Sequence, residues 1–527
     1  MKDETDRAPS GLRDLGPDAL LCRMTELGVR LRAEGDSLCY DAPSAVVTPE
    51  LLAALSRNKA SLLSRLNAGV ERRAPVTFQQ RGFIGFLRHH GVPQVYNVAT
   101  RITCRGPLNV AALRAALSAL VARHEALRTR YVHADDERWQ EVLRPRPVDL
   151  PVDDLTALPY DARTDEIERM SARLADTPFD LSAGVAPVFR LLRAEERRWV
   201  LLFVLHHASC DAWALSVLLK ELAALYRAAA AGVPHGLDSP MQPTEYALRQ
   251  RDTPVADERK LTYWARQLAG TPFRVDLPTD RPRPEALSGR GDAILFTVSA
   301  DVRAKVEAFA RRHDTTPFAV TTAALGVLLW RLSGQSDIVL GVPYANRERR
   351  ALENLVACAA VTFALRLRVG EADSFPALVK AVASDTIDAI SNIMPLWEMG
   401  ARLNDIPGRP PIGFQYQNAL DTNIEFPGVT VAIEDLVVPA ARGEFYAGLI
   451  PTGEVLGGYI EYSTDLWDRE TIRQWAEAYK ELLRDAVDGT LRLTDAGKVR
   501  ADAGPGARSG GRSGGRSGVS AVLGPWR

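Results

Sequence analysis

The clearest hydrophobic pattern in the chain is an apolar run over residues 199–205. Its length and continuity predict a strand that is buried on both faces. Leucines then recur between residues 215 and 222 at the i, i+3, i+4, i+7 spacing that predicts a helix. His206, His207 and Asp211 lie between these two elements. Because neighbouring side chains of a strand point to opposite faces, His206 and His207 cannot both face one cavity.

Residues 11–67 show the pattern of a small domain of their own. Apolar residues at helical spacing follow Pro17, and Gly28 suits the end of that helix. Alternating apolar residues on both sides of the turn at 34–36 predict a β-hairpin. Thr48 is a candidate N-cap for one further helix, whose leucines continue to residue 66.

The remaining chain divides into segments that differ in composition and in hydrophobic pattern. Residues 68–75 are polar and predict a short linker, while helical and strand patterns alternate over 76–490 and predict a mixed α/β body. A proline- and charge-rich stretch at 241–260 indicates a boundary between subdomains at 76–250 and 251–490. Residues 1–10 and the Gly-, Arg- and Ser-rich residues 491–527 predict disordered tails.

Composition narrows the class of protein. The chain has 527 residues with 65 basic and 66 acidic side chains, which argues against a predominantly basic nucleic-acid-binding protein. No apolar run approaches the roughly 20 residues that span a bilayer, and the charged N-terminus is unlike a signal peptide. Five scattered cysteines without a CxxC pair indicate neither a disulfide framework nor a metal site. We therefore expect a cytoplasmic, monomeric enzyme without metal, nucleic-acid or membrane partners.

The stretch HHASCDAW, residues 206–213, resembles the HHxxxDG motif of condensation domains from nonribosomal peptide synthetases. Further stretches in the same order resemble other blocks of that family, so that the resemblance covers residues 76–487. These stretches are RHEALRT at 123–129, YW at 263–264, LAGTPFRVDLPTDRPRP at 268–284, GVPYANR at 341–347, FQYQN at 414–418 and YSTDLWD at 462–468.

The resemblance implies a fold, an activity and partners. The fold is a V-shaped pair of chloramphenicol-acetyltransferase-like α/β subdomains with the active site in a tunnel between them. A donor carrier protein and an acceptor carrier protein each deliver a substrate on a phosphopantetheine arm, and no intrinsic cofactor is needed. The acceptor amine attacks the donor thioester and forms an amide, as in peptide-bond formation.

The resemblance also implies roles for single residues. His207 carries over as the catalytic histidine, which orients the acceptor amine or takes its proton. Asp211 carries over as the aspartate whose ion pair holds the active-site loop, with Arg347 as the preferred partner and Arg128 as the second. His206 is expected to be structural, packed on the opposite face. His124 and Glu125 are expected to lock a helix, and a nucleophilic role for Cys210 is disfavoured because no supporting signature accompanies it.

Several positions depart from the family pattern. Ala212 replaces the glycine of the motif, Ala214 replaces a serine, and Val361 replaces an asparagine. If the backbone at Ala212 needs a positive φ, alanine is strained by roughly 1 kcal/mol or more; if it is helical, the methyl group narrows the tunnel floor. Together with Trp213 and Asn346, Ala214 and Val361 are candidate tunnel residues.

Residues 11–67 resemble the TubC-type docking domain that begins some synthetase subunits. In that family an exposed hairpin captures a peptide from the C-terminus of the upstream subunit by strand addition. A helical cap folded onto the main body is the alternative interpretation.

Two alternative functions stay open. No adenylation or carrier pattern follows residue 490, so we expect the protein to act in trans. Acyl transfer onto a free small-molecule amine or alcohol is therefore the second interpretation. A non-catalytic scaffold that recruits carrier proteins is the third interpretation; the intact His207 and Asp211 argue against it, and Ala212 argues mildly for it.

Overall fold

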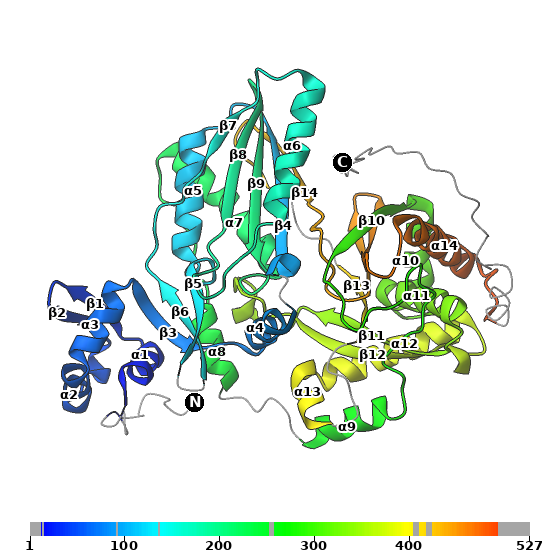
Figure 1. Ribbon diagram of the computed structural model, residues 1–527, viewed down its shortest axis with the longest axis horizontal. Coiled ribbons are helices and arrows are strands. Elements are labelled where there is room, and N and C mark those ends of the chain that lie inside the picture. Colours follow the sequence, from blue (N-terminus) through cyan, green and yellow to red (C-terminus); the bar gives the residue numbers. More distant parts are fainter. Residues whose placement is uncertain are drawn as a thin grey trace.

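The computed structural model describes residues 12, 15–90, 93–134, 137–251, 258–403, 410–417 and 424–493. It forms three units: a small N-terminal unit and two larger α/β subdomains that stand side by side (Figure 1). The mixed α/β class predicted from the sequence is confirmed. The tails predicted at 1–10 and 491–527 lie outside the described residues, except for residues 491–493.

The N-terminal unit packs three helices against a two-stranded hairpin. The hairpin pairs in register from Arg30 with Asp41 to Glu34 with Ser37, as the alternating pattern predicts. The backbone N–H of Leu51 donates to the Thr48 hydroxyl at 3.2 Å, so Thr48 is the N-cap. The elements are α1 (Pro17–Glu26), β1 (Arg30–Glu34), β2 (Ser37–Asp41), α2 (Pro49–Arg57) and α3 (Lys59–Asn67).

The single helix predicted from Pro49 to Leu66 is wrong, because it divides at Asn58 into α2 and α3. The Asn58 backbone leaves the helical region, with φ −94° and ψ 6°. Its side-chain amide donates to the carbonyl oxygens of Leu15 at 3.3 Å and Ala54 at 3.0 Å. A short polar side chain thus competes with the helical hydrogen bonds and ends α2.

The linker predicted at 68–75 is also wrong: Val70–Pro75 forms strand β3. β3 pairs antiparallel with β6 (Glu137–Leu143), which also pairs with β5 (Thr129–Ala134). The charged residues of this stretch favoured a linker, but the Arg73 side chain is fully buried. Its guanidinium lies 4.6 Å from the centre of the Trp139 ring and pairs with Asp18 of α1. The N-terminal unit is therefore joined to the body by a strand and a buried ion pair.

The first subdomain is a five-stranded sheet with helices on both faces. Helices α5 and α7 cover one face and α6 covers the other (Figure 1). The strand order is β14-β4-β9-β8-β7. Its other elements are α4 (Phe78–His90), β4 (Asn97–Arg105), α5 (Val110–Arg123), β7 (Val152–Asp154), α6 (Tyr160–Ala175), β8 (Val188–Glu195), β9 (Arg198–His206), α7 (Ala212–Ala231) and α8 (Pro243–Arg251).

The second subdomain is a six-stranded sheet of order β10-β16-β15-β13-β11-β12 with most of its helices on one side (Figure 1). A single large apolar cluster joins the sheet to these helices. The elements are α9 (Glu258–Leu268), β10 (Gly291–Val298), α10 (Ala300–Arg312), α11 (Pro317–Ser333), β11 (Asp337–Tyr344), β12 (Val361–Arg368), α12 (Phe375–Ser391), α13 (Leu396–Arg402), β13 (Ile412–Tyr416), β15 (Phe445–Thr452), β16 (Val455–Ser463) and α14 (Arg469–Asp488).

Strand β14 (Thr430–Asp435) corrects the boundary predicted for the second subdomain at 251–490. It leaves that half and pairs antiparallel with β4 of the first sheet, from Thr430 with Arg105 to Asp435 with Thr100. Ile424 and Phe426, which precede β14, are buried in the core of the first subdomain. An unpaired edge of β4 would expose its peptide groups, and β14 covers them. The second half of the chain therefore contributes one strand and its preceding apolar residues to the first subdomain.

Among the described helices no single one is long and apolar enough to cross a membrane, although the bent pair α10–α11 reaches the required length and composition together.

Candidate active site

The turn between β9 and α7 presents both histidines of the predicted motif. β9 ends at His206, and the backbone N–H of Ala208 donates to His206 Nδ1 at 3.0 Å. The backbone N–H and the hydroxyl of Ser209 both donate to the His206 carbonyl, at 2.9 and 2.7 Å. These bonds close a tight turn whose geometry is fixed before α7 begins at Ala212.

His207 is half-buried between two aromatic rings. Its backbone N–H donates to the Tyr96 carbonyl at 2.8 Å. Its imidazole stacks on Phe83 with ring centres 5.4 Å apart and planes at 28°, and the Tyr96 ring meets it edge-on at 6.4 Å. The two aromatic side chains come from before β4, so they fix the histidine from a different part of the chain.

His206 touches the same two rings as His207 but is more deeply buried. The expected packing of the two histidines on opposite faces is wrong, because β9 ends at His206 and strand alternation does not extend to His207. The His206 side chain is fully buried, with the rings of Phe83, Tyr96 and Phe179 within 6.3 Å. Burial, with a smaller contribution from the neighbouring His207, lowers its pKa to about 3. His206 is therefore a neutral, enclosed side chain at working pH, whereas His207 is partly accessible.

Asp211 links the start of α7 to a loop of the second half of the chain. Its Oδ1 caps α7 by accepting the backbone N–H of Ala214 at 2.9 Å. Its Oδ2 accepts the backbone N–H groups of Ala359 and Ala360, both at 3.0 Å, and Arg347 Nη1 at 2.7 Å. Both carboxylate oxygens are thus satisfied, and each fixes a different segment.

Arg347 organises the loop that faces Asp211. Besides the ion pair, it donates to the carbonyl oxygens of Ala345 at 3.1 Å and Ala357 at 3.0 Å. Its side chain is 1% exposed. The structure therefore joins Asp211 to Arg347, the first of the two expected partners. Arg128 lies elsewhere and pairs with Glu71 at 2.8 Å.

The backbone at Ala212 is helical, which decides between the two alternatives for the missing glycine. Ala212 is the first residue of α7 and does not have a positive φ. Ala214, also in α7, is fully buried. The methyl group at Ala212 therefore adds bulk at the helix start without backbone strain.

The other three tunnel candidates frame the same loop. The Trp213 indole N–H donates to the Glu353 carbonyl at 2.8 Å, and its ring centre lies 6.0 Å from the Arg347 guanidinium. Asn346 has φ 54°, and its side-chain amide donates to the Ala359 carbonyl at 3.1 Å. Val361 begins β12 opposite Tyr344 and is half-buried. Trp213 remains 44% exposed, so it is the most accessible of the set.

Two other residues that were singled out in the sequence, His124 and Glu125, make hydrogen bonds within the framework. His124 shares a 2.7 Å hydrogen bond with Glu221 of α7, and Glu125 accepts the Thr244 hydroxyl at 2.6 Å. Cys210 is buried, and burial raises the pKa of its thiol far above the usual range. A thiol that stays protonated is a poor nucleophile, so the geometry disfavours Cys210.

Sequence reasoning missed the residues on α4 that surround the site. Gln80 accepts the backbone N–H of Thr77 at 2.8 Å, while the Thr77 hydroxyl accepts that of Gln80 at 3.2 Å. The T-x-x-Q spacing of this capping box is present in the sequence, and it predicts that a helix containing Phe83 begins after Thr77. Gln80 also donates to the Tyr131 hydroxyl, which donates to the Ala208 carbonyl at 3.3 Å.

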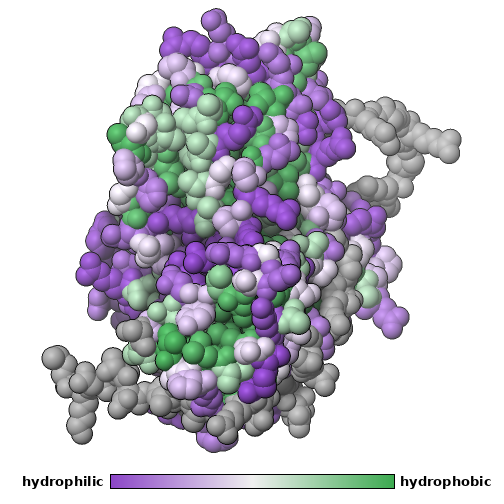
Figure 2. All heavy atoms as spheres, turned by 90° about the vertical axis from the view of Figure 1, so that its left-hand side faces the viewer, coloured by the Kyte–Doolittle hydropathy of each residue, from purple (hydrophilic) through white to green (hydrophobic). Residues whose placement is uncertain are grey.

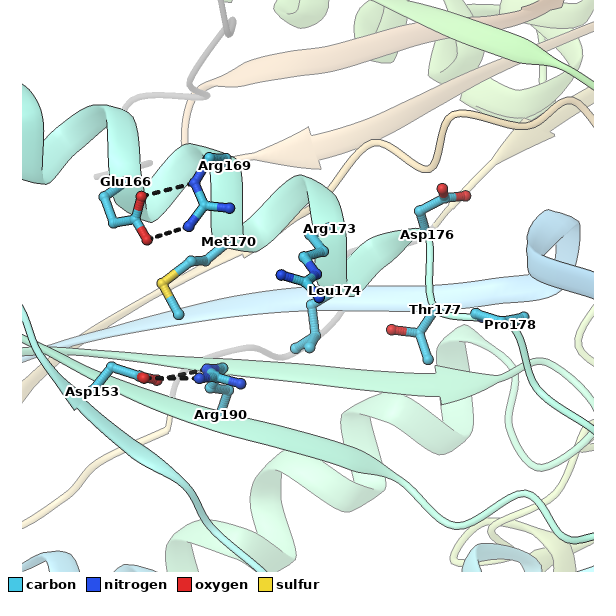
Figure 3. A pocket seen from close by; sticks show the side chains of 10 residues that line it. All are labelled: Asp153, Glu166, Arg169, Met170, Arg173, Leu174, Asp176, Thr177, Pro178 and Arg190. Carbon is cyan, nitrogen blue, oxygen red and sulfur yellow. Dashed lines mark hydrogen bonds and ion pairs between the residues drawn. The ribbon is translucent and has the colours of Figure 1, made fainter.

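The described residues contain no cluster of three or more side chains suited to holding a metal ion. A hollow of about 840 Å³ lies between α6 and the strands β7 and β8 (Figure 3). Two ion pairs line it, Asp153 with Arg190 and Glu166 with Arg169. Arg173 and Asp176 add one charge of each sign, so the lining of the hollow has no net charge.

The sequence matches two family models. The family model of the condensation domain matches residues 70–496, and the model of the TubC N-terminal docking domain matches residues 18–67. Phosphinothricin tripeptide synthetase PhsB of Streptomyces viridochromogenes is 33% identical over 79% of the chain. The chain spans 36% of the length of that synthetase.

Two solved structures share the fold. The SgcC5 protein from Streptomyces globisporus superposes with a TM-score of 0.68 at 24% identity, over 79% of this chain and 98% of that one. The first condensation domain of the calcium-dependent antibiotic synthetase superposes with a TM-score of 0.70 at 18% identity, over 80% and 98%.

Proposed function

Because the chain belongs to the condensation domain family of nonribosomal peptide synthetases, whose members form amide bonds, we propose that it joins a donor acyl or peptidyl thioester to an acceptor amine. The substrates arrive on the phosphopantetheine arms of separate donor and acceptor carrier proteins. The observation that carries the proposal is the placement of His207: it is held between Phe83 and Tyr96, four residues from the Asp211–Arg347 pair that joins the two halves.

His207 acts on the acceptor amine. An α-amino group titrates near 7.7–8.0, so a substantial fraction is already neutral near pH 7.5. The imidazole orients this amine and takes its proton as the amine adds to the thioester carbonyl. The proton then leaves with the thiolate when the carbon–sulfur bond breaks, which yields an amide and a free phosphopantetheine thiol. Holding both arms in register removes the entropy of an encounter in solution, a contribution of up to roughly 7–11 kcal/mol.

The N-terminal unit recruits the upstream synthetase subunit. Its hairpin strands β1 and β2 pair only with each other among the described strands, so their outer edges can accept an added strand. The unit faces the viewer in the lower half of Figure 2, where apolar side chains gather among hydrophilic ones. Tyr40 and Leu52, which are 39% and 42% exposed, belong to it. An extended peptide with apolar side chains fits this surface.

Intact-mass spectrometry of carrier proteins tests the reaction. A panel of aminoacyl donor carriers is mixed with aminoacyl acceptor carriers and with free amines and alcohols. We expect condensed product on an acceptor carrier with the wild type and with His133→Ala, an exposed histidine, and none with His207→Ala. Product only on free amines or alcohols would replace this proposal with transfer to a small molecule. Carrier binding without product in any variant would favour the scaffold interpretation.

A titration tests the docking role. Peptides matching the C-terminal tails of candidate upstream subunits are added to the full chain. We expect binding that Tyr40→Ala weakens and that Val233→Ala, at a residue 56% exposed outside the docking unit, leaves unchanged. Equal binding by both variants would contradict capture by the hairpin.

A further inference from the structure

Asn97 and His206 are directly opposite each other on the strands β4 and β9. Both side chains belong to the sheet face that α6 covers, next to Ala99 and Val204 of the same face. The Asn97 side-chain amide donates to the carbonyl oxygens of Ala175 at 2.8 Å and Thr177 at 2.7 Å. Two carbonyl partners identify the nitrogen of this amide, so Asn97 Oδ1 is the atom turned away from them.

The position of the proton on His206 follows from its backbone contact. Nδ1 accepts the N–H of Ala208, so in the neutral ring the proton is on Nε2. The low pKa caused by burial keeps the ring neutral. Nε2 is thus a buried donor, and within the described part of the chain neither it nor Asn97 Oδ1 has a hydrogen-bond partner.

We propose that a single buried water molecule bridges these two atoms, accepting the Nε2–H of His206 and donating to Oδ1 of Asn97. Directly opposite residues of an antiparallel pair have Cβ atoms about 4.5–5.5 Å apart, which suits one small bridging molecule. Buried polar groups left without a protein partner are the usual sites of such waters. A donor and an acceptor in one enclosure match the two roles of a water molecule.

The side chains that enclose His206 and Asn97 exclude ligands much larger than a water molecule. His206 is fully buried and Asn97 is 8% exposed, so a phosphopantetheine arm has no access to them. The rings of Phe83, Tyr96 and Phe179 wall His206 and offer no stronger acceptor to Nε2. A small neutral ligand with one donor and one acceptor is the class that fits.

The bridge makes His206 a positioning residue for His207, a role that rests on the catalytic function proposed above. Asn97 is anchored to the C-terminal end of α6 through Ala175 and Thr177. His206 is anchored to the turn that presents His207. The water would therefore join α6 to that turn and fix the position of the catalytic ring.

A crystal structure of the full chain, at a resolution that shows ordered waters, tests the bridge directly. We expect one water within hydrogen-bond distance of both His206 Nε2 and Asn97 Oδ1. An empty enclosure, or a direct bond between the two atoms, would overturn the proposal. The result does not depend on activity, so it holds even if the protein forms no amide bond.

Two variants test the positioning role. His206→Gln keeps an N–H donor, and His206→Met removes it at similar size. We expect kcat to fall about tenfold in His206→Met with KM unchanged, and to recover within threefold of the wild type in His206→Gln. The ¹⁵N resonances of the His207 ring should shift in the Met variant without any substrate. Unshifted His207 resonances and an unchanged kcat in the Met variant would overturn the positioning role. If the Met variant does not fold, the crystal structure of the wild type still shows whether the water bridge exists.

Discussion

Arg347 and Asp211 meet at 2.7 Å although 136 residues separate them along the chain. Both side chains are almost fully buried, and Arg347 also bonds the loop that supplies two backbone N–H groups to Asp211. This pair is the point at which the second half of the chain fixes the histidine-bearing turn of the first.

Replacing Arg347 by methionine should leave Asp211 as an uncompensated buried charge. Loss of one partner from such a pair destabilises a protein by about 3–5 kcal/mol. We expect the free energy of unfolding in urea to fall by that amount, and activity to fall with it. Arg473→Met removes an exposed pair with Glu470 and should cause no measurable change. Equal stability of the two variants would show that the buried pair does not hold the loop.

Removal of strand β3 should lower the stability of the α/β body. A chain that starts at Ala68 keeps β3, whereas one that starts at Val76 lacks it and leaves an edge of β6 unpaired. Val70 and Ala74, which are fully buried, would also be lost. We expect the shorter chain to be aggregation-prone with a lower Tm in a thermal scan. Identical Tm values would contradict a stabilising role for β3.

Stability should depend on pH through His206. Its pKa is about 3 when folded and near 6.5 when unfolded, so between these values the unfolded chain binds a proton that the folded chain does not. The free energy of unfolding therefore falls as pH drops below 6.5, by about 1.4 kcal/mol per pH unit, and this contribution is constant above 6.5. Urea unfolding at pH 7.5 and 5.5 should show that extra loss in the wild type and not in His206→Gln. The same loss in both would assign it to other groups.

Removing the ring beneath His207 should slow turnover. Phe83→Leu loses the stack at 5.4 Å but keeps an apolar side chain. A small displacement of a catalytic group can slow a reaction by up to about 100-fold, so we expect kcat to fall between 10- and 100-fold with KM little changed. Steady-state kinetics with Phe83→Tyr, which keeps the ring, provides the control. A Leu variant as fast as the Tyr variant would contradict the role of the stack.

The sequence predicted the elements whose patterns are local. The buried strand, the histidine turn and the helix after Asp211 follow from hydrophobic spacing, and all three are found. The likeness to a known family supplied Arg347 as the partner of Asp211; spacing alone does not reveal a contact across 136 residues.

What the sequence could not predict depends on partners distant along the chain. β3 looked like a linker because its arginines are charged, and only Asp18 and Trp139 make Arg73 a buried residue. β14 looked like part of the second subdomain, yet it covers the edge of β4. Phe83 lies in an ordinary amphipathic helix, and its contact with His207 appears only when that helix is placed.

The proposed role of His207 is tested most directly by a single-turnover measurement with one matched pair of loaded donor and acceptor carriers. Rapid quenching and intact-mass spectrometry would follow product formation with the wild type and with His207→Ala at saturating protein. General acid–base catalysis contributes typically 10²- to 10⁴-fold, so we predict that the variant is slower by at least about 100-fold while both carriers still bind. Equal rates for the wild type and His207→Ala would contradict the assignment of His207 as the group that acts on the acceptor amine.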